Sequence, residues 1–144
     1  MNDVIVVGTD GSDTADVAVQ RAAALAKLTG ARIELVSGYR EDYSLVAGTG
    51  MYVGDLSGDA RKAADGCLES TATRLRADGL EVETHCMGGD PADALIGIAE
   101  ATDASMIVVG SKGMHGGRRF LLGNVPNKVS HHAPCSVMIV RTTG

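Results

Sequence analysis

The chain has 144 residues, of which 44% are hydrophobic and 22% charged, and this profile predicts one soluble domain over residues 1–144. Its core must be aliphatic, because the sequence contains one Phe, three Tyr and no Trp. The net charge of −5 argues against a surface that neutralises nucleic-acid phosphates. No apolar stretch approaches the ~20 residues of a membrane span and the N-terminus lacks a basic leader, so we expect a cytoplasmic protein that binds neither nucleic acid nor membrane.

Strands and helices are predicted to alternate along the chain. Continuous apolar runs predict strands, and apolar residues at a helical period predict helices. The expected strands cover 4–8, 33–39, 81–87, 105–109 and 136–141. The expected helices cover 14–29, 60–77, a stretch that begins at Pro91, and 124–132. Residues 40–57 are polar and glycine-rich without a clear period, so we expect a long connection there.

This alternation predicts an α/β fold, in which βαβ units form a mostly parallel sheet with helices on both faces. Ligands of such sheets bind beyond the carboxyl ends of the strands, where the strand order reverses. The rule points to the two loops that follow strands 4–8 and 105–109.

The loop after strand 105–109 is suited to an anion. Gly110 and Gly113 let the backbone approach a ligand closely, and a helix that starts at Gly123-Asn124 would add partial positive charge. Asn124 is the expected N-cap of that helix and a side-chain donor, while Lys112 could lie beside a phosphate chain as a countercharge. The pattern therefore predicts a phosphate cradle.

The same loop carries a resemblance that extends over the whole chain. Gly110, Gly113 and Gly123 fit the pattern G-x2-G-x9-G-[ST] of the nucleotide-binding universal stress proteins, and the start (residues 4–12), Gly88-Gly89-Asp90-Pro91 and the end (residues 136–141) are similar to that family too. The resemblance implies a Rossmann-like three-layer sandwich, similar to the adenine nucleotide alpha hydrolases. Its parallel sheet has five strands in the order 3-2-1-4-5. Dimers that pair through the last strand are also implied.

Carried over position by position, the resemblance places an adenine nucleotide between the two loops. Asp10 would hold the ribose or base, the backbone of Gly38 would meet the adenine edge, and Val109 would pack against the base. Asn124 departs from the family pattern, which has Ser or Thr after the last glycine. The implied binding residues are Gly8, Thr9, Asp10, Gly38, Val109, Gly110, Ser111, Lys112, Gly113, Gly123, Asn124 and Val125.

The function that this implies is a ligand-responsive regulator in stress adaptation. It would bind ATP, with or without Mg²⁺, and AMP or cyclic AMP are the alternative ligands. The alternative interpretation of the same site is a cyclic AMP-binding protein that acts as a sink or sensor of this nucleotide. We expect no catalytic or metal-binding residues and at most slow ATP hydrolysis, because the motifs assemble no general base, nucleophile or metal cluster.

Two further alternatives remain open at this point. Asp10 could be the nucleophile of a phosphoryl-transfer enzyme, although the phosphatases that resemble haloacid dehalogenases carry a second Asp two residues away, where this chain has Gly8 and Ser12. The protein could also be a scaffold with a vestigial pocket.

The remaining histidines and cysteines suggest ordinary structural roles. Adjacent His131 and His132 point about 100° apart on a helix and cannot readily share a metal ion. His85 lacks the other ligands of a zinc site, and His115 is expected on an exposed loop. The three cysteines form no C-x-x-C motif and are expected to be reduced and packed in or near the core.

The last predicted strand suggests a partner. Val137 and Ile139 point to one face and Met138 and Val140 to the other, so the strand is apolar on both sides although it should lie at a sheet edge. Pairing of Ser136 to Arg141 with a second copy would cover that edge. We therefore expect a homodimer.

Overall fold

The computed structural model describes residues 3–39, 44–45, 52–53, 55–111 and 119–142. Its elements alternate as the sequence predicts, with one additional pair of short strands. In chain order they are β1 (Val4–Gly8), α1 (Asp13–Thr29), β2 (Arg32–Tyr39), β3 (Ser44–Leu45), β4 (Tyr52–Val53), α2 (Asp55–Ala77), β5 (Val82–Gly88), α3 (Pro91–Thr102), β6 (Met106–Gly110), α4 (Arg119–His132) and β7 (Ser136–Val140).

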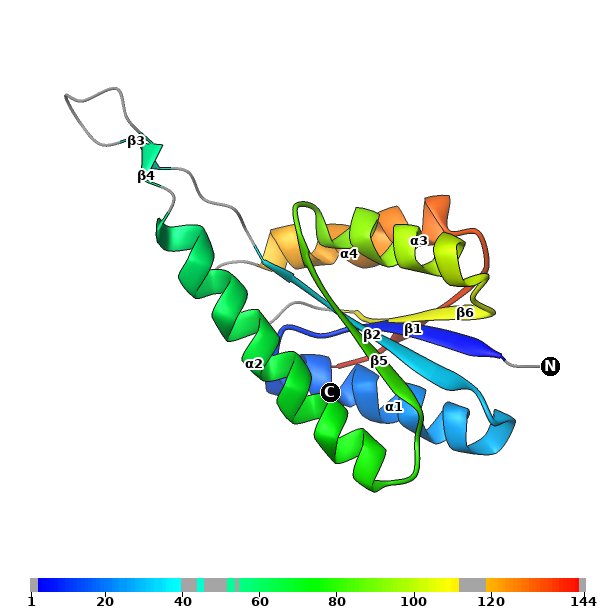
Figure 1. Ribbon diagram of the computed structural model, residues 1–144. Helices are drawn as coiled ribbons and strands as arrows, with labels where there is room; N and C mark the ends of the chain where they lie inside the picture. Colours follow the sequence, from blue (N-terminus) through cyan, green and yellow to red (C-terminus); the bar gives the residue numbers. More distant parts are fainter. Residues whose placement is uncertain (1–2, 40–43, 46–51, 54, 112–118, 143–144) are drawn as a thin grey trace.

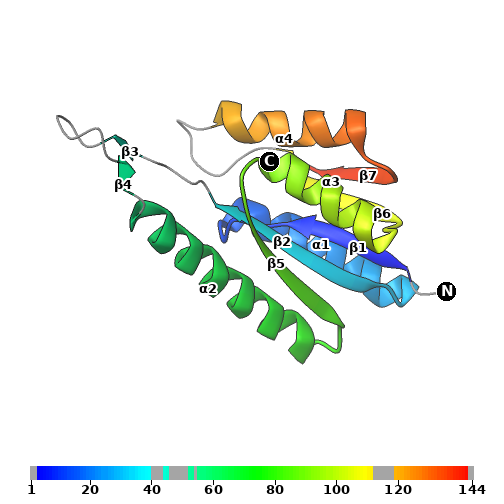
Figure 2. The same ribbon diagram turned by 45° about the horizontal axis from the view of Figure 1, so that its top comes forward.

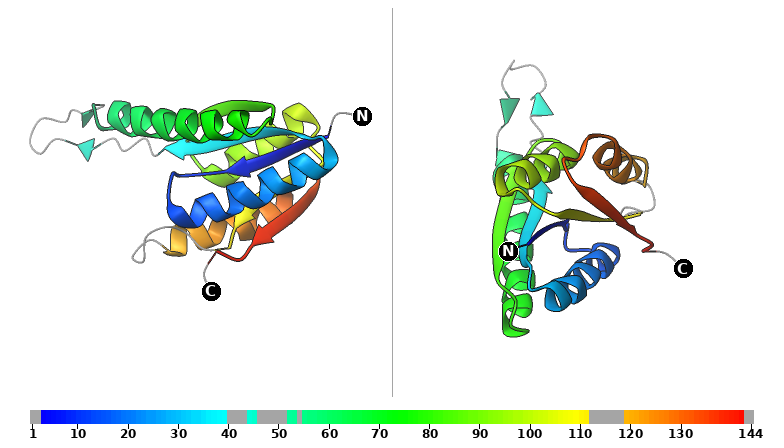
Figure 3. Two further views of the ribbon diagram at one scale, coloured as in Figure 1. Left: turned by 90° about the horizontal axis from the view of Figure 1, so that it is seen from below. Right: turned by 90° about the vertical axis from the view of Figure 1, so that its right-hand side faces the viewer.

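Five of these strands form one sheet in the order β5-β2-β1-β6-β7, and every neighbouring pair is parallel. Numbered among themselves, the strands stand in the order 3-2-1-4-5, which confirms the prediction. Helices α1 and α2 lie on one face and α3 and α4 on the other, so the molecule has three layers (Figures 1 and 3).

Each face of the sheet has its own aliphatic core, because the central strands alternate side chains between two apolar layers. On the side of α1 and α2, Leu35 and Leu68 are fully buried among the small alanines of α1. On the side of α3 and α4, Ile107 and Val129 are fully buried with Leu95. The small side chains of α1 let this helix lie close to the sheet.

Helices α1 and α3 are capped by residues next to the ends of the strands. The Ser12 side chain accepts a hydrogen bond from the Ala15 amide at the start of α1, and Gly30 ends that helix with φ of 77°. Asp90 caps α3 by accepting from the Ala92 amide, and Pro91 is the first residue of the helix. These turns fix the direction in which both helices leave the end of the sheet.

The expected long connection over 40–57 is wrong in part. Strands β3 and β4 pair antiparallel within it, and α2 begins at Asp55 rather than at Ala60. The first turns of α2 extend past the end of the sheet (Figures 1 and 3). The sequence of these turns, residues 55–59, has no clear apolar period, so pattern analysis does not detect them.

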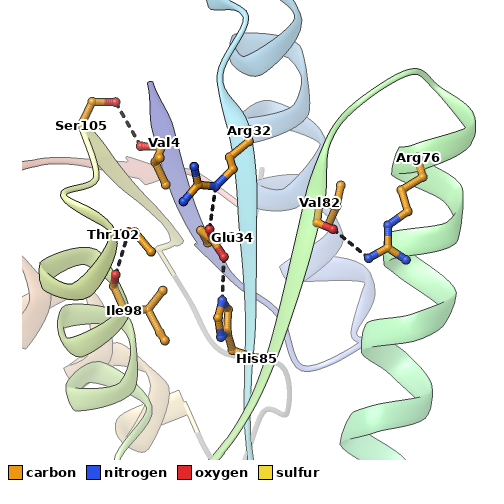
Figure 4. Close-up of polar contacts among 9 residues, drawn as sticks. All are labelled: Val4, Arg32, Glu34, Arg76, Val82, His85, Ile98, Thr102 and Ser105. Carbon is orange, nitrogen blue, oxygen red and sulfur yellow. Dashed lines mark hydrogen bonds and ion pairs between the residues drawn. The ribbon is translucent and has the colours of Figure 1, made fainter. Parts of the chain in front are cut away.

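A buried carboxylate joins β2 to the edge strand β5 (Figure 4). The side chain of Glu34 is 3% exposed and accepts hydrogen bonds from Arg32 Nε at 2.8 Å and from His85 Nε2 at 2.6 Å. The carboxylate also raises the pKa of the Arg32 guanidinium above its usual range. Both oxygens of Glu34 are thus used, and this polar cluster fixes His85 in a structural role.

None of the helices in the described ranges combines the length and the apolar character that a membrane crossing needs.

Candidate functional site

The order of the strands reverses at β1, whose neighbours are β2 and β6. The chain leaves β1 through α1 on one face and leaves β6 toward α4 on the opposite face (Figure 3). The carboxyl ends of β1 and β6 therefore lie side by side, at the position where sheets of this kind bind ligands in a crevice. We call this edge of the sheet, with the residues that follow β1 and the end of β6, the rim.

The loop after β1 is held in one shape by its own polar groups. The Thr9 amide donates to the Val36 carbonyl at 2.8 Å, and Thr9 Oγ1 accepts from the Gly11 amide at 3.1 Å. Asp10 Oδ1 accepts from the Ser12 amide at 2.9 Å. Among the described parts of the chain, no hydrogen bond is made to the second carboxylate oxygen of Asp10, which can accept from a ligand hydroxyl or amine.

Helix α2 supports this loop from behind. Gly11 has φ of +83°, and a Cβ built on it would stand 2.5 Å from Cys67 Sγ. Glycine is therefore required here for two independent reasons, the left-handed backbone and the nearby sulfur. Helix α2 therefore packs directly against the loop after β1, which the sequence motifs do not show.

Gly8 and Gly38 both face α3. A Cβ on Gly8 would lie 3.3 Å from Leu95, and one on Gly38 would lie 3.5 Å from Pro91. The missing side chains let α3 pack on the ends of β1 and β2, and any contact of these residues with a ligand would be made by their backbone. Their assignment to a binding site remains a prediction.

On the other side of the crevice, the end of β6 is tied to β7. The Ser111 amide donates to the Val140 carbonyl at 2.7 Å, and Ser111 Oγ accepts from the Thr142 amide at 3.2 Å. The hydroxyl hydrogen of Ser111 can still be donated to a ligand oxygen. Val109 is 4% exposed and packs in the core under α3 and α4, where Val125 also packs.

The predicted helix start at Asn124 is wrong. Helix α4 begins at Arg119, so Gly123, Asn124 and Val125 lie beyond its first turn and Asn124 is not an N-cap. The helix continues through Pro126. Free helical amides belong to the first turn, so an anion at this end would meet the turn that begins at Arg119. Lys112, Gly113 and His115 lie outside the described residues.

Lys128 joins α4 to the start of α3. Its Nζ lies 2.6 Å from Asp90 Oδ2 and 2.9 Å from Asp93 Oδ1. The hydrogen bond from Lys128 holds the pKa of Asp90 below its usual range, and the two carboxylates raise the pKa of Lys128. Figure 2 shows that α3 and α4 lie side by side. Lys128 therefore neutralises two carboxylates at the end of the sheet where the crevice opens.

Because the folded-state pKa of Asp90 is lowered, its carboxylate stabilises the fold above its unfolded pKa of about 3.9, and this contribution is lost as the pH falls through the folded value. We expect Asp90→Asn to keep the helix cap, to lower the free energy of unfolding at neutral pH and to flatten its decline in acid. Urea unfolding between about pH 6 and about pH 2.5 measures this slope. An unchanged acid slope in the variant would contradict the assignment.

Within the described residues, no three His, Cys, Asp or Glu side chains are placed to hold a metal ion. The rings of His131 and His132 are exposed, with centroids 6.4 Å apart. All three cysteines are free thiols, and burial raises the pKa of Cys86 and of Cys135. Raised pKa values keep these two thiols protonated at neutral pH, which makes them poor nucleophiles.

The sequence of the chain matches a known family. The sequence profile of the Universal stress protein family matches residues 1–141. The chain belongs to the universal stress protein family.

Curated relatives of this universal stress protein cover almost the same length. It is 31% identical over 144 residues to Universal stress protein YxiE of Bacillus subtilis, with 95% of this chain and 97% of the relative covered. It is 33% identical over 153 residues to Universal stress protein Rv1636 of Mycobacterium tuberculosis, with 96% of each chain covered.

Solved structures of universal stress proteins are similar as well. One of them, a universal stress protein in complex with cAMP, has a TM-score of 0.73, 28% identity and 98% coverage of both chains. The universal stress protein of Archaeoglobus fulgidus in complex with dAMP has a TM-score of 0.67, 25% identity and 98% coverage of both chains. Two structural neighbours thus hold adenine nucleotides.

Three features of the structure are absent from the sequence prediction. They are the Gly11–Cys67 contact, the bridge of Lys128 to Asp90 and Asp93, and the carboxylate of Glu34. Each joins residues that are distant in sequence, so no local motif reveals them. The presence of Glu34 inside an otherwise apolar predicted strand is a signal that could have drawn attention to that cluster, because a buried charge requires partners.

Proposed function

We propose that residues 1–144 form one cytoplasmic domain that binds an adenine nucleotide, with ATP as the preferred ligand, and responds to it as a regulator in stress adaptation. Binding rather than catalysis is the proposed activity. The Asp10 carboxylate accepts from the Ser12 amide and serves the turn of the loop, which suits an acceptor for a ligand better than a nucleophile.

One observation carries this proposal. The loop after β1 is preformed, with Thr9, Asp10 and Gly11 fixed by hydrogen bonds and packing, and it lies where the strand order reverses beside the end of β6. A preformed loop does not lose conformational freedom when a ligand binds, so more of the contact energy appears as affinity. The cAMP and dAMP complexes of similar proteins indicate the adenylate class.

The rim offers groups that fit each part of such a ligand. The second oxygen of Asp10 can accept from ribose hydroxyls, and the backbone at Gly38 can meet the base edge. At the phosphate end, the Ser111 hydroxyl and the first turn of α4 can donate to phosphate oxygens. If Mg²⁺ accompanies ATP, it would neutralise phosphate charge there.

Cyclic AMP is the second candidate ligand. Its support is the similar universal stress protein that was solved in complex with cAMP. Cyclic AMP is also compatible with Asn124, which stands where the family pattern has Ser or Thr and therefore lacks a hydroxyl donor. A cyclic phosphate carries one charge and requires fewer donors than a triphosphate.

We also propose a homodimer through β7. This strand is one edge of the sheet, and Ile139 on it is 49% exposed. An exposed apolar edge strand favours pairing with another strand. A monomeric mass in solution at micromolar concentration would contradict this part of the proposal.

Calorimetric titration of the purified protein with ATP, ADP, AMP and cyclic AMP, with and without Mg²⁺, tests the function. We expect saturable binding of ATP and a loss of roughly tenfold or more in Asp10→Asn, which keeps the turn but loses the charged acceptor. Asp78→Asn is the matched control, because this exposed carboxylate is paired with Lys27 at the opposite end of the molecule.

The other outcomes have distinct meanings. Preferential binding of cyclic AMP would establish the second candidate ligand. No detectable binding of any of the four ligands would reject nucleotide binding. Steady-state ATP turnover near 10 s⁻¹ that Asp10→Asn abolishes would instead identify a phosphoryl-transfer enzyme.

A further inference from the structure

The rim of the crevice carries several negative charges. Asp10 follows β1, and Asp90 follows the end of β5 as the N-cap of α3. Asp93 lies in the first turn of the same helix. These carboxylates lie at the end of the sheet where the proposed nucleotide binds, and each of them repels a phosphate group unless it is neutralised.

Lys128 reaches this group from another helix. Its Nζ contacts Asp90 at 2.6 Å and Asp93 at 2.9 Å, so one ammonium serves both carboxylates. Asp90 uses its other oxygen to accept from the Ala92 amide. The bridge therefore compensates charge at the start of α3 without removing the helix cap.

The same bridge is connected to the base end of the proposed site. Pro91, which follows Asp90, packs on Gly38 at the end of β2, with Pro91 Cγ 3.5 Å from the position that a Cβ of Gly38 would take. A contiguous set of contacts thus runs from α4 through Lys128, Asp90 and Pro91 to the strand end that would face the adenine.

We propose that Lys128 is a specificity-determining positioning residue, which makes the rim accept ligands of high negative charge by neutralising Asp90 and Asp93. This inference rests on the proposed adenine-nucleotide function and extends it to the discrimination among phosphate numbers. Lys128 acts through the two carboxylates and does not touch the ligand. Its removal exposes about one additional unit of negative charge at the rim, and the repulsion grows with the charge of the ligand.

Titration of Lys128→Met with adenosine, AMP, ADP and ATP at low and at physiological salt tests the proposal. We expect ATP affinity to fall roughly three- to tenfold, ADP and AMP affinity to fall progressively less, and adenosine affinity to stay within about twofold. The loss for ATP should shrink as salt rises, because salt screens charges at the rim.

Three further variants separate charge from structure. Lys128→Arg should restore ATP affinity, since it keeps the positive charge. Lys128→Met combined with Asp93→Asn should recover part of the affinity, because Asp93 is exposed and does not cap the helix. Lys27→Met is the matched control: it removes the same charge from the far end of α1, where Lys27 lies 3.8 Å from Asp78, and should leave all four affinities unchanged.

Equal losses for adenosine and ATP would overturn the proposal, because they would show that Lys128 only holds α3 and α4 together. Unchanged ATP affinity in Lys128→Met would overturn it as well. If the unaltered protein binds none of the four ligands, the proposed function itself fails, which is a different result from binding that is indifferent to residue 128.

Discussion

Gly11→Ala is expected to lower the free energy of unfolding by about 2–3 kcal/mol. Two effects combine in this value. An alanine at φ of +83° costs about 1–2 kcal/mol in backbone strain, and its Cβ would stand 2.5 Å from Cys67 Sγ. We also expect weaker nucleotide binding, since the loop that carries Asp10 would have to shift away from α2. Urea unfolding and the ATP titration measure the two consequences.

The chain provides matched controls that separate strain from crowding. Gly30 has φ of +77° with no atom within 4 Å of its added Cβ, so Gly30→Ala isolates the backbone strain. Gly66 lies inside α2 with open space around it, and Gly66→Ala should stabilise the fold by up to about 1 kcal/mol.

A double-mutant cycle then tests the contact with α2 directly. In a Cys67→Ala background, the cost of Gly11→Ala should fall close to that of Gly30→Ala, because the sulfur is gone and only the Cβ of residue 67, 3.3 Å from the added Cβ, remains near. If Gly11→Ala and Gly30→Ala cost the same in the unaltered background, the packing of Cys67 does not shape the loop.

Glu34→Gln is expected to lower the free energy of unfolding by about 2–3 kcal/mol. Glutamine has nearly the same size, but it can offer one oxygen where the carboxylate offers two. The amide nitrogen finds no acceptor in Arg32 Nε, and it finds one in His85 Nε2 only if that imidazole takes its Nδ1–H tautomer. In either orientation the negative charge that faces the Arg32 guanidinium is lost. Urea unfolding at neutral pH measures the loss.

Glu83→Gln is the control for this change. Glu83 stands opposite Glu34 in the register of β5 and β2, but it is exposed to solvent. Its substitution should therefore change stability by less than about 0.5 kcal/mol. Equal effects of the two substitutions would mean that the charge of the strand pair matters and that the buried hydrogen bonds do not.

Local signals in the sequence were sufficient for most of the fold. The apolar runs at 4–8 and 105–109 predict buried parallel strands, and Ser12, Gly30 and Asp90 mark helix ends with side-chain or backbone chemistry that acts within a few residues. Where the local signal is missing, the prediction fails. The sequence at 55–59 has no clear apolar period, and Gly123-Asn124 resembles a helix start although α4 begins at Arg119.

The same distinction applies to the candidate site, where some features can be recognised from the sequence and others cannot. The glycine-rich loops and Asp10 could be recognised from the sequence, because turn chemistry and glycine spacing are properties of short segments. The roles of Gly8 and Gly38 could not, since the structure shows that α3 fills the space beside them. Lys112 and Gly113 stay predictions.

By itself, the sequence determined the alternation of strands and helices, the parallel sheet and the rim at which two loops meet, because periodicity and capping are encoded within single elements. The tertiary structure alone decided which distant side chains meet. Cys67 behind Gly11, Lys128 between Asp90 and Asp93, and His85 on Glu34 each join two elements. Such contacts depend on how helices pack across the sheet, which no short segment of the chain specifies.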